Sequence, residues 1–111
     1  LKRGLEMAKS FGYTTVNEGR MFGAMHDVMA DAARRGLVDV DFIGWMDYTG
    51  RAALDTGYSA TYANRYRLGG LKITLDGSPQ GRTAWRTKPY LIPPDGQKAG
   101  YKGYPAIPDT K

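Results

Sequence analysis

The stretch Met21–Met46, MFGAMHDVMADAARRGLVDVDFIGWM, decides the fold of this chain. Its first half repeats apolar residues at intervals of three and four, which is the spacing of the buried face of a helix. That half closes on Arg-Arg-Gly (34–36), a cationic last turn followed by the residue that most often ends helices. Its second half alternates apolar residues with aspartates, which is the period of a β-strand. The stretch therefore predicts a helix over 21–35 and a strand near 38–46.

The flanking segments continue this alternation of helices and strands. Residues 1–11 have helical spacing, residues 13–17 are β-branched as strands are, and residues 71–75 (LKITL) form a mostly apolar strand. Between the last two strands we expect a helix somewhere within 58–67. Such alternation is typical of successive β/α units with parallel strands, so the fold class is α/β. Residues 1–75 then form an arc of a barrel or of an open sheet, because three strands alone leave two edges and one face uncovered.

Residues 76–111 have neither a helical nor a strand period. They hold all six prolines of the chain and many of its glycines. Aromatic residues, among them Trp85, Tyr90 and Tyr101, are interleaved with these breakers and favour burial. A long irregular segment with buried rings is typical of a functional loop, so we interpret 76–111 as an active-site loop or lid.

Composition excludes several classes of function. The chain has 111 residues and no cysteine, which rules out disulfides, thiolate catalysis and cysteine-ligated zinc. No apolar run approaches the ~20 residues needed to span a membrane, and no signal peptide is visible, so we expect a cytoplasmic protein. The first residue, Leu1, falls inside a predicted helix with no initiator methionine, which suggests a segment of a longer protein.

The net charge of +5 raises the alternative of a basic binding module for nucleic acid or another acidic partner. Nucleic-acid binders gather Lys and Arg on one face, whereas here the cations are scattered along the whole chain. The densest run, Arg82–Lys88, does interleave with Trp85 and precedes Tyr90. The scatter argues against nucleic acid and leaves this cluster as the support for the alternative.

Lys72 is the most informative single residue for chemistry. It lies between Leu71 and Ile73 in the strand expected at 71–75, where a buried ammonium would be costly. A desolvated lysine is a nucleophile, or reacts with carbon dioxide to give a carbamate whose oxygens can bridge two divalent metals. The alternative is a lysine whose aliphatic stem is buried and whose ammonium reaches solvent.

The residues that follow the predicted strands are the other candidates. In α/β barrels the catalytic groups lie at the carboxyl ends of strands and in the loops that follow them. Glu18 and Asp47 are expected at such strand ends, on the same rim as Lys72. The candidate pocket residues are Glu18, Asp47, Asp76, Gly77, Ser78, Gln80 and Trp85. For Glu18 and Asp47 the alternative is a surface or capping carboxylate, for Asp76–Gly77 an ordinary turn, and for Trp85 simple packing.

The segment LKITLDGSPQGRTAWRTKPYLIPPDGQ (71–97) resembles the fourth-strand region of the amidohydrolase superfamily. More narrowly, it is similar to the branch that includes N-substituted formamide deformylase and many uncharacterised metal-dependent hydrolases. The matching motifs are Lys72, Asp76-Gly77-Ser78, Thr83-Ala84 and Pro89-Tyr90, and the stretch Gly12–Val16 resembles the second-strand pattern of that branch. The resemblance spans most of the chain, and its 71–90 motif set is the specific part.

The resemblance implies a (β/α)8 TIM barrel, of which this chain would be a partial segment around strands two to four. It also implies a divalent metal, zinc in our expectation, and hydrolysis of amide or formamide C–N bonds by a metal-activated water. Lys72 occupies the position at which family members carry a metal-bridging carboxylated lysine. The substrate would be a small amide-type molecule, and the remainder of the barrel would be the partner of this segment.

The sequence also departs from the family. The family's metal site needs several histidines on other strands, and this chain has one, His26, which matches none of those positions. His26 falls on the helix predicted over 21–35, where we expect a packing or surface role. We therefore predict that the isolated chain is inactive. A third interpretation is structural: open strand edges could pair copies of the chain into a homo-oligomer.

Overall fold

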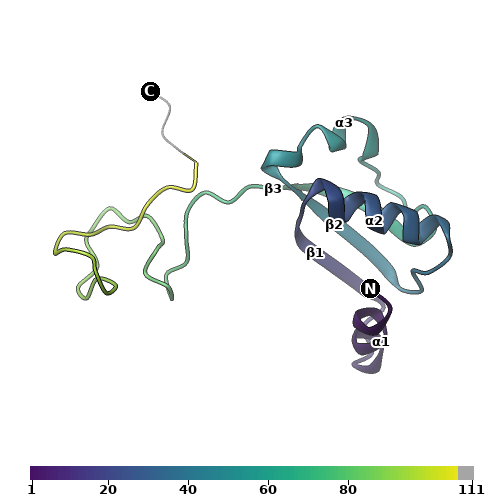
Figure 1. Ribbon diagram of the computed structural model, residues 1–111, viewed down its shortest axis with the longest axis horizontal. Helices are drawn as coiled ribbons and strands as arrows, with labels where there is room; N and C mark the ends of the chain where they lie inside the picture. The colour runs from purple at the N-terminus through teal and green to yellow at the C-terminus, as the bar shows by residue number, and fades with distance from the viewer. Residues whose placement is uncertain (108–111) are drawn as a thin grey trace. The chain divides into compact units, whose positions relative to one another are not determined.

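The first part of the chain forms a three-stranded parallel sheet with helices packed on one face (Figure 1). The computed structural model describes residues 1–107 and divides the chain into two units, Leu1–Ile73 and Thr74–Lys111. The elements of the first unit are α1 (Lys2–Ser10), β1 (Thr15–Met21), α2 (Gly23–Arg34), β2 (Asp41–Asp47), a short 3-10 turn (Tyr48–Gly50), α3 (Ala53–Gly57) and β3 (Tyr66–Lys72). The expected α/β class with parallel strands is confirmed.

The central strand β2 pairs with both neighbours, in the order β1-β2-β3. Thr15 of β1 lies opposite Asp41 at the start of β2, and Phe42 lies opposite Tyr66 at the start of β3. Both pairings are parallel, so each connection must return over the sheet, which is what α2 and the segment containing α3 do. All three strands consequently begin at one edge of the sheet and end at the other.

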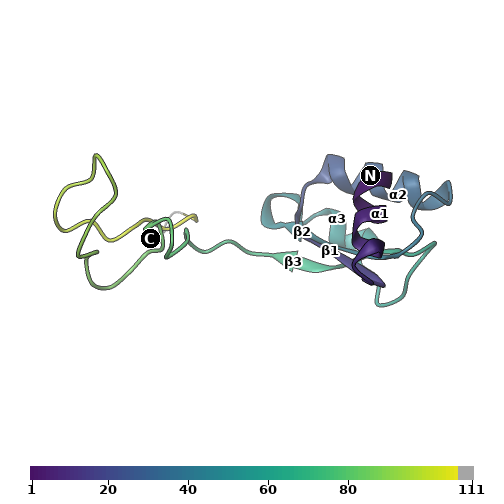
Figure 2. The ribbon, with the colours of Figure 1, turned by 90° about the horizontal axis from the view of Figure 1, so that it is seen from below.

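One face of the sheet is covered and the other is bare. Seen from below, α2 lies on one side of the strands, and no helix of the first unit lies across the opposite side (Figure 2). The core between helices and sheet consists of Leu5, Met21, Met29, Ala32, Ala33, Val38, Val40, Phe42, Met46, Tyr66 and Leu68. No helix among residues 1–107 is long and apolar enough to cross a membrane.

Gly44 is required where β2 crosses the core. A Cβ at this position would lie 2.6 Å from Sδ of Met21 and 3.3 Å from Cδ2 of Leu68. Phe42 and Met46, two residues to either side, point into the same core, as the alternation of a strand demands. The missing side chain therefore makes room for the Met21 side chain from the neighbouring strand.

The helix expected within 58–67 is wrong, and the third strand lies earlier than 71–75. The helix of this region is α3, which ends at Gly57, and β3 begins at Tyr66. Just before β3, Asn64 and Arg65 both have positive φ, and Ala63 exchanges backbone hydrogen bonds with Tyr66, so the chain makes a tight turn there. Paired glycines inside the strand (69–70) obscured its β pattern in the sequence.

The other two strands are displaced from their expected bounds by a few residues. The strand predicted at 13–17 spans Thr15–Met21, and the strand predicted at 38–46 spans Asp41–Asp47. Val38 and Val40 are buried, yet they lie in the connection before β2. Their alternation reflects packing against the core, which the periodicity of the sequence does not distinguish from strand pairing.

The second unit has no helix and no strand in its described part, residues 74–107. An isolated bridge joins Asp76 and Pro105 near its two ends. Two further backbone hydrogen bonds, from Arg86 N to Lys102 O at 2.8 Å and from Tyr90 N to Tyr101 O at 3.0 Å, hold two passes of the chain side by side. The ring centroids of Tyr90 and Tyr101 are 6.0 Å apart and stacked, which gives these aromatic residues the packing expected of them.

We predict that Leu68→Ala destabilises the first unit by about 2–5 kcal/mol, because Leu68 is among the most deeply buried side chains and its loss leaves a cavity. The measurement is the midpoint of urea unfolding followed by circular dichroism. Val28→Ala, on the exposed face of α2, is the control and should change stability by no more than about 0.5 kcal/mol. Equal effects of the two substitutions would contradict the assigned core.

Candidate functional site

The strands of the first unit end side by side on Met21, Asp47 and Lys72, which define the carboxyl edge of the sheet. The register places Met21 opposite Met46, and Asp47 opposite Lys72. Met46 lies in the core, so strand alternation turns Asp47 toward the bare face of the sheet. The predicted juxtaposition of Asp47 and Lys72 at strand ends is therefore present.

Asp47 is a buried carboxylate fixed by three hydrogen bonds. Its Oδ1 accepts from the backbone N of Thr49 at 3.0 Å and from Oγ1 of Thr49 at 2.6 Å, and its Oδ2 accepts from Nε of Arg20 at 2.7 Å. Only 5% of its side chain is exposed. The hydrogen bonds from Thr49, then the bond from Arg20, lower the pKa of Asp47 to about 2. This group stays ionised and orients neighbouring donors; it is not a proton donor near neutral pH.

Arg20 is the member of this edge that sequence reasoning missed. It belongs to β1, carries the ion pair to Asp47 across to β2, and its guanidinium lies 5.5 Å from the ring centroid of Phe22. The signal was an arginine near the end of one strand and an aspartate at the end of the next. The ion pair between the two residues depends on how the strands pair, which the sequence alone does not reveal.

Lys72 is exposed, so its predicted burial inside a strand is wrong. It is the last residue of β3, and the residues expected to bury it, Ile73 and Leu75, lie beyond the strand and are exposed. None of the ion pairs found among residues 1–107 involves Lys72. Its ammonium therefore stands at the carboxyl edge without a carboxylate partner among the described residues.

Glu18 lies within β1 and does not end it. Its register partner is Gly44, in the middle of β2, and its Oε1 accepts a hydrogen bond from the backbone N of Arg20 at 2.9 Å. The expectation that Glu18 shares the rim with Lys72 is therefore wrong. The strand continues past Glu18 to Met21, because the register irregularity between these two residues lets the pairing resume at Met46.

The bare face of the sheet carries Trp45 directly beneath the carboxyl edge. Trp45 lies opposite Gly70, and a Cβ on Gly70 would come within 2.7 Å of the indole ring. Gly69 makes room for Ile43 in the same way, because a Cβ on Gly69 would lie 2.5 Å from Cγ2 of Ile43. The two glycines thus make room for Ile43 and Trp45 of β2, which share this face with Asn17 and Arg67, the register neighbours of Ile43.

The loop motif Asp76-Gly77-Ser78 stabilises a turn of the second unit through hydrogen bonds and one close contact. Oδ2 of Asp76 accepts from the backbone N of Trp85 at 2.9 Å, and the backbone N of Ser78 donates to Oγ1 of Thr83 at 2.9 Å. A Cβ on Gly77 would lie 2.0 Å from Oγ1 of Thr83, so only glycine fits there. The structure brings these predicted residues together in one tight turn.

Gln80 and Trp85 complete the set of predicted pocket residues. Both side chains are exposed in the second unit. No hydrogen bond of the Gln80 side chain is found in the described part of the chain, and Trp85 contributes its backbone to the Asp76 bond. Gln80 and Trp85 are thus the predicted residues whose side chains this fold leaves available.

A metal site is not completed by the residues that the structure describes. Within residues 1–107 no three His, Cys, Asp or Glu side chains come together as metal ligands. Asp47 is committed to Arg20 and Thr49, and Lys72 has no second ligand beside it. The donor set of residues 1–107 therefore does not fit a complete divalent metal centre, which needs three or four ligands.

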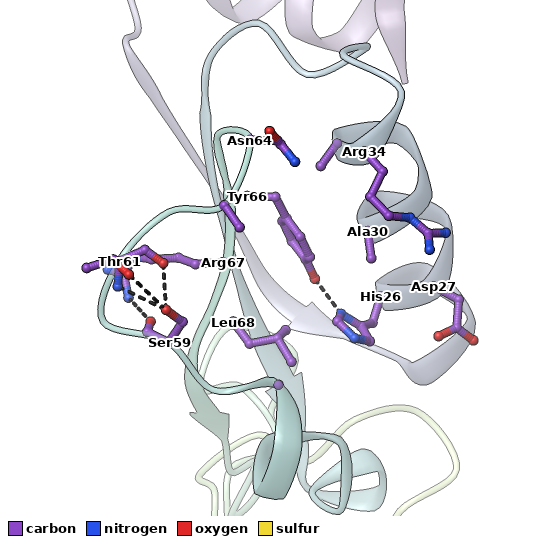
Figure 3. A pocket seen from close by; sticks show the side chains of 13 residues that line it. His26, Asp27, Ala30, Arg34, Ser59, Thr61, Asn64, Tyr66, Arg67 and Leu68 are labelled. Atoms are coloured by element: carbon purple, nitrogen blue, oxygen red, sulfur yellow. Dashed lines mark hydrogen bonds between the residues drawn. The ribbon is translucent and has the colours of Figure 1, made fainter.

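A cavity of about 420 Å³ lies on the helix side of the sheet, between α2 and the segment leading into β3 (Figure 3). His26 points into it from α2, and its Nδ1 lies 2.7 Å from the hydroxyl of Tyr66, which in turn donates to Sδ of Met21 at 3.2 Å. Burial, with a smaller effect of the nearby Asp27 carboxylate, raises the pKa of Tyr66 to about 12. This network joins α2, β3 and β1, and the phenol stays protonated.

Comparison with known proteins shows the fold. Over 96% of this chain, the structure is similar to an uncharacterized metal-dependent hydrolase from Pyrococcus horikoshii OT3, with a TM-score of 0.78 and 22% sequence identity. The chain spans 21% of the length of that hydrolase. No family model matches the sequence, and no curated protein matches it.

The Asp47 carboxylate gives a prediction for acid stability. Because its pKa is about 2 in the folded state and ordinarily 3.8, its contribution to stability is full above pH 3.8 and is lost as the pH falls toward 2. Asp47→Asn should therefore be less stable than the parent near neutral pH, and the difference should shrink across that window. Urea midpoints measured between about pH 7 and pH 2 test this.

The control for Asp47 is Asp55→Asn, on the exposed surface of α3. Its difference from the parent protein should be small and nearly constant over the same pH range. If the difference in stability between Asp47→Asn and the parent protein stays constant down to about pH 2, ionisation of the Asp47 carboxylate does not stabilise the fold.

Gly77→Ala should disorder the turn of the second unit, because the added methyl group cannot coexist with Thr83. We expect the amide resonances of residues 76–85 to lose dispersion in nuclear magnetic resonance spectra, while those of the first unit persist. Gln80→Ala, in the same loop with an exposed side chain, is the control and should leave the spectrum nearly unchanged. An ordered turn in Gly77→Ala would refute the assigned contact.

Proposed function

We propose that this chain is a segment of a metal-dependent hydrolase that cleaves C–N bonds of small amide-type substrates. The observation that carries the proposal is the pairing of Asp47 and Lys72 at the carboxyl edge of a parallel sheet. In β/α barrels that edge is where the catalytic groups gather. The similarity in fold to a metal-dependent hydrolase and the motif resemblance of residues 71–90 to amidohydrolases both support it.

The bare face of the sheet fits a barrel interior. Helices cover one side of the strands, and the apolar Ile43 and Trp45 lie on the other side without a covering layer in the first unit. In a closed barrel the inward side chains of several strands pack against one another. We infer that further strands of a longer protein cover this face, and that they are the partner of this segment.

Asp47 and Arg20 would hold the geometry of the edge, and Lys72 would supply its reactive group. The ion pair fixes the ends of β1 and β2 relative to each other. Lys72 is exposed, and its side chain would become a metal ligand after the ammonium loses its proton, either as the neutral amine or as the carbamate formed with carbon dioxide. The other ligands would come from other strands. Zinc is our proposal for that metal, and the amide class of substrate follows from the resemblance.

The experiment needs the longer protein, expressed from the sequence that surrounds this segment. Its hydrolysis of an N-substituted formamide and its metal content should both depend on Lys72. We expect Lys72→Ala to lower kcat/KM by at least about a hundredfold and to reduce bound metal, because a metal-bridging ligand is removed. Elemental analysis and steady-state kinetics supply the two measurements.

Lys102→Ala is the matched control, since it removes the same charge from an exposed position in the second unit. It should leave activity and metal content unchanged. Zinc titration of the isolated chain should show no tight stoichiometric site, because its described residues form no set of ligands. Full activity of Lys72→Ala, or tight zinc binding by the isolated chain, would contradict the proposal.

A further inference from the structure

The second unit contains a cavity of about 570 Å³ whose charged lining is entirely cationic. We call it the cationic cavity; it is lined by Arg82, Arg86, Lys88, Tyr90, Leu91 and Ile92, together with two prolines. No acidic side chain lines it. The only acids among residues 74–107 are Asp76, which is bonded to the backbone of Trp85, and Asp95, which does not line the cavity.

The cations that line this cavity have no carboxylate partner among the described residues. In the first unit some cations are paired, among them Arg20, Arg34, Arg35 and Arg65, and others, such as Arg51 and Lys72, are not. Among residues 74–107 no ion pair is found. Three like charges around one cavity repel one another, so an anion placed between them relieves the repulsion and gains charge-assisted hydrogen bonds.

Three of the lining side chains, those of Arg82, Arg86 and Tyr90, make contacts within the second unit. The Arg86 guanidinium lies 5.3 Å from the ring centroid of Tyr90, whose hydroxyl donates to the carbonyl O of Ala84 at 2.9 Å. One guanidinium nitrogen of Arg82 donates to the carbonyl O of Pro93 at 3.3 Å. A lining fixed before binding loses less entropy when a ligand arrives.

Apolar side chains adjoin these charges. Leu91 is 102% exposed, and Ile92 next to it is also exposed, although both are large apolar side chains. A ligand with an apolar group would cover them while its charged group meets the cations. The arrangement therefore selects for both a negative charge and a short hydrocarbon portion.

We propose that the cationic cavity binds small organic carboxylates that carry an apolar group. The carboxylate lies among Arg82, Arg86 and Lys88, and the hydrocarbon portion lies against Leu91 and Ile92. This inference goes beyond the proposed hydrolase function and does not depend on it, because the cavity belongs to the second unit alone and requires no metal.

The test is titration of the isolated chain with sodium hexanoate, followed by amide resonances in nuclear magnetic resonance spectra. Saturable shifts should appear at residues 82–92 and be absent from the first unit. Hexanamide, which has the same shape without the charge, should bind at least about tenfold more weakly. Arg86→Gln should weaken hexanoate binding about fivefold, and Arg86→Lys, which keeps the charge, should restore part of it.

The matched control is Lys98→Gln, which removes a cation of the same unit that does not line the cavity. It should leave hexanoate binding within about twofold of the parent protein. Equal binding of hexanoate and hexanamide, or equal weakening by Arg86→Gln and Lys98→Gln, would overturn the proposal. It would also be overturned if hexanoate caused no saturable shifts. Binding of a single-stranded oligonucleotide to residues 82–92 with steep salt dependence would then assign the cations to nucleic acid.

Discussion

The parallel pairing of β2 with both of its neighbours is the constraint on which the first unit depends. Parallel strands all run in one direction, so each connection must cross back over the sheet. Each of the two connections contains a helix, α2 in the first and α3 in the second. The helices bury one face, and Gly44 lets the Met21 side chain cross under the central strand. The same pairing collects three strand ends at one edge, which is why Asp47 and Lys72 lie opposite each other.

The carboxyl edge combines rigidity with one free group. Asp47 is fully committed to Thr49 and Arg20, and its low pKa follows from those bonds. Lys72, at the neighbouring position, has no partner within the described residues and stands in solvent. The carboxyl edge therefore places one unpaired cation beside a fixed ion pair.

The second unit uses its polar residues differently. The motif residues Asp76, Gly77, Ser78 and Thr83 are engaged in the turn that they form, and their hydrogen bonds run to one another or to nearby backbone. These contacts give the motif residues a structural role in the turn. Among residues 74–107 the cations form no ion pair, and three of them line the cavity proposed above to bind carboxylates.

The sequence by itself determined the α/β class, the parallel order and the helix α2, because a helical apolar face followed by an alternating strand is a local property of residues 21–46. It also placed Asp47 at a strand end and identified the turn around Gly77. Only the tertiary structure decided that β3 spans Tyr66–Lys72, that Glu18 lies within β1, and that Arg20 meets Asp47. The physical reason is that strand bounds and cross-strand contacts are set by the register of each strand with its partner. The need for glycine at Gly69, likewise, comes from the Ile43 side chain of the neighbouring strand, which the sequence alone does not place there.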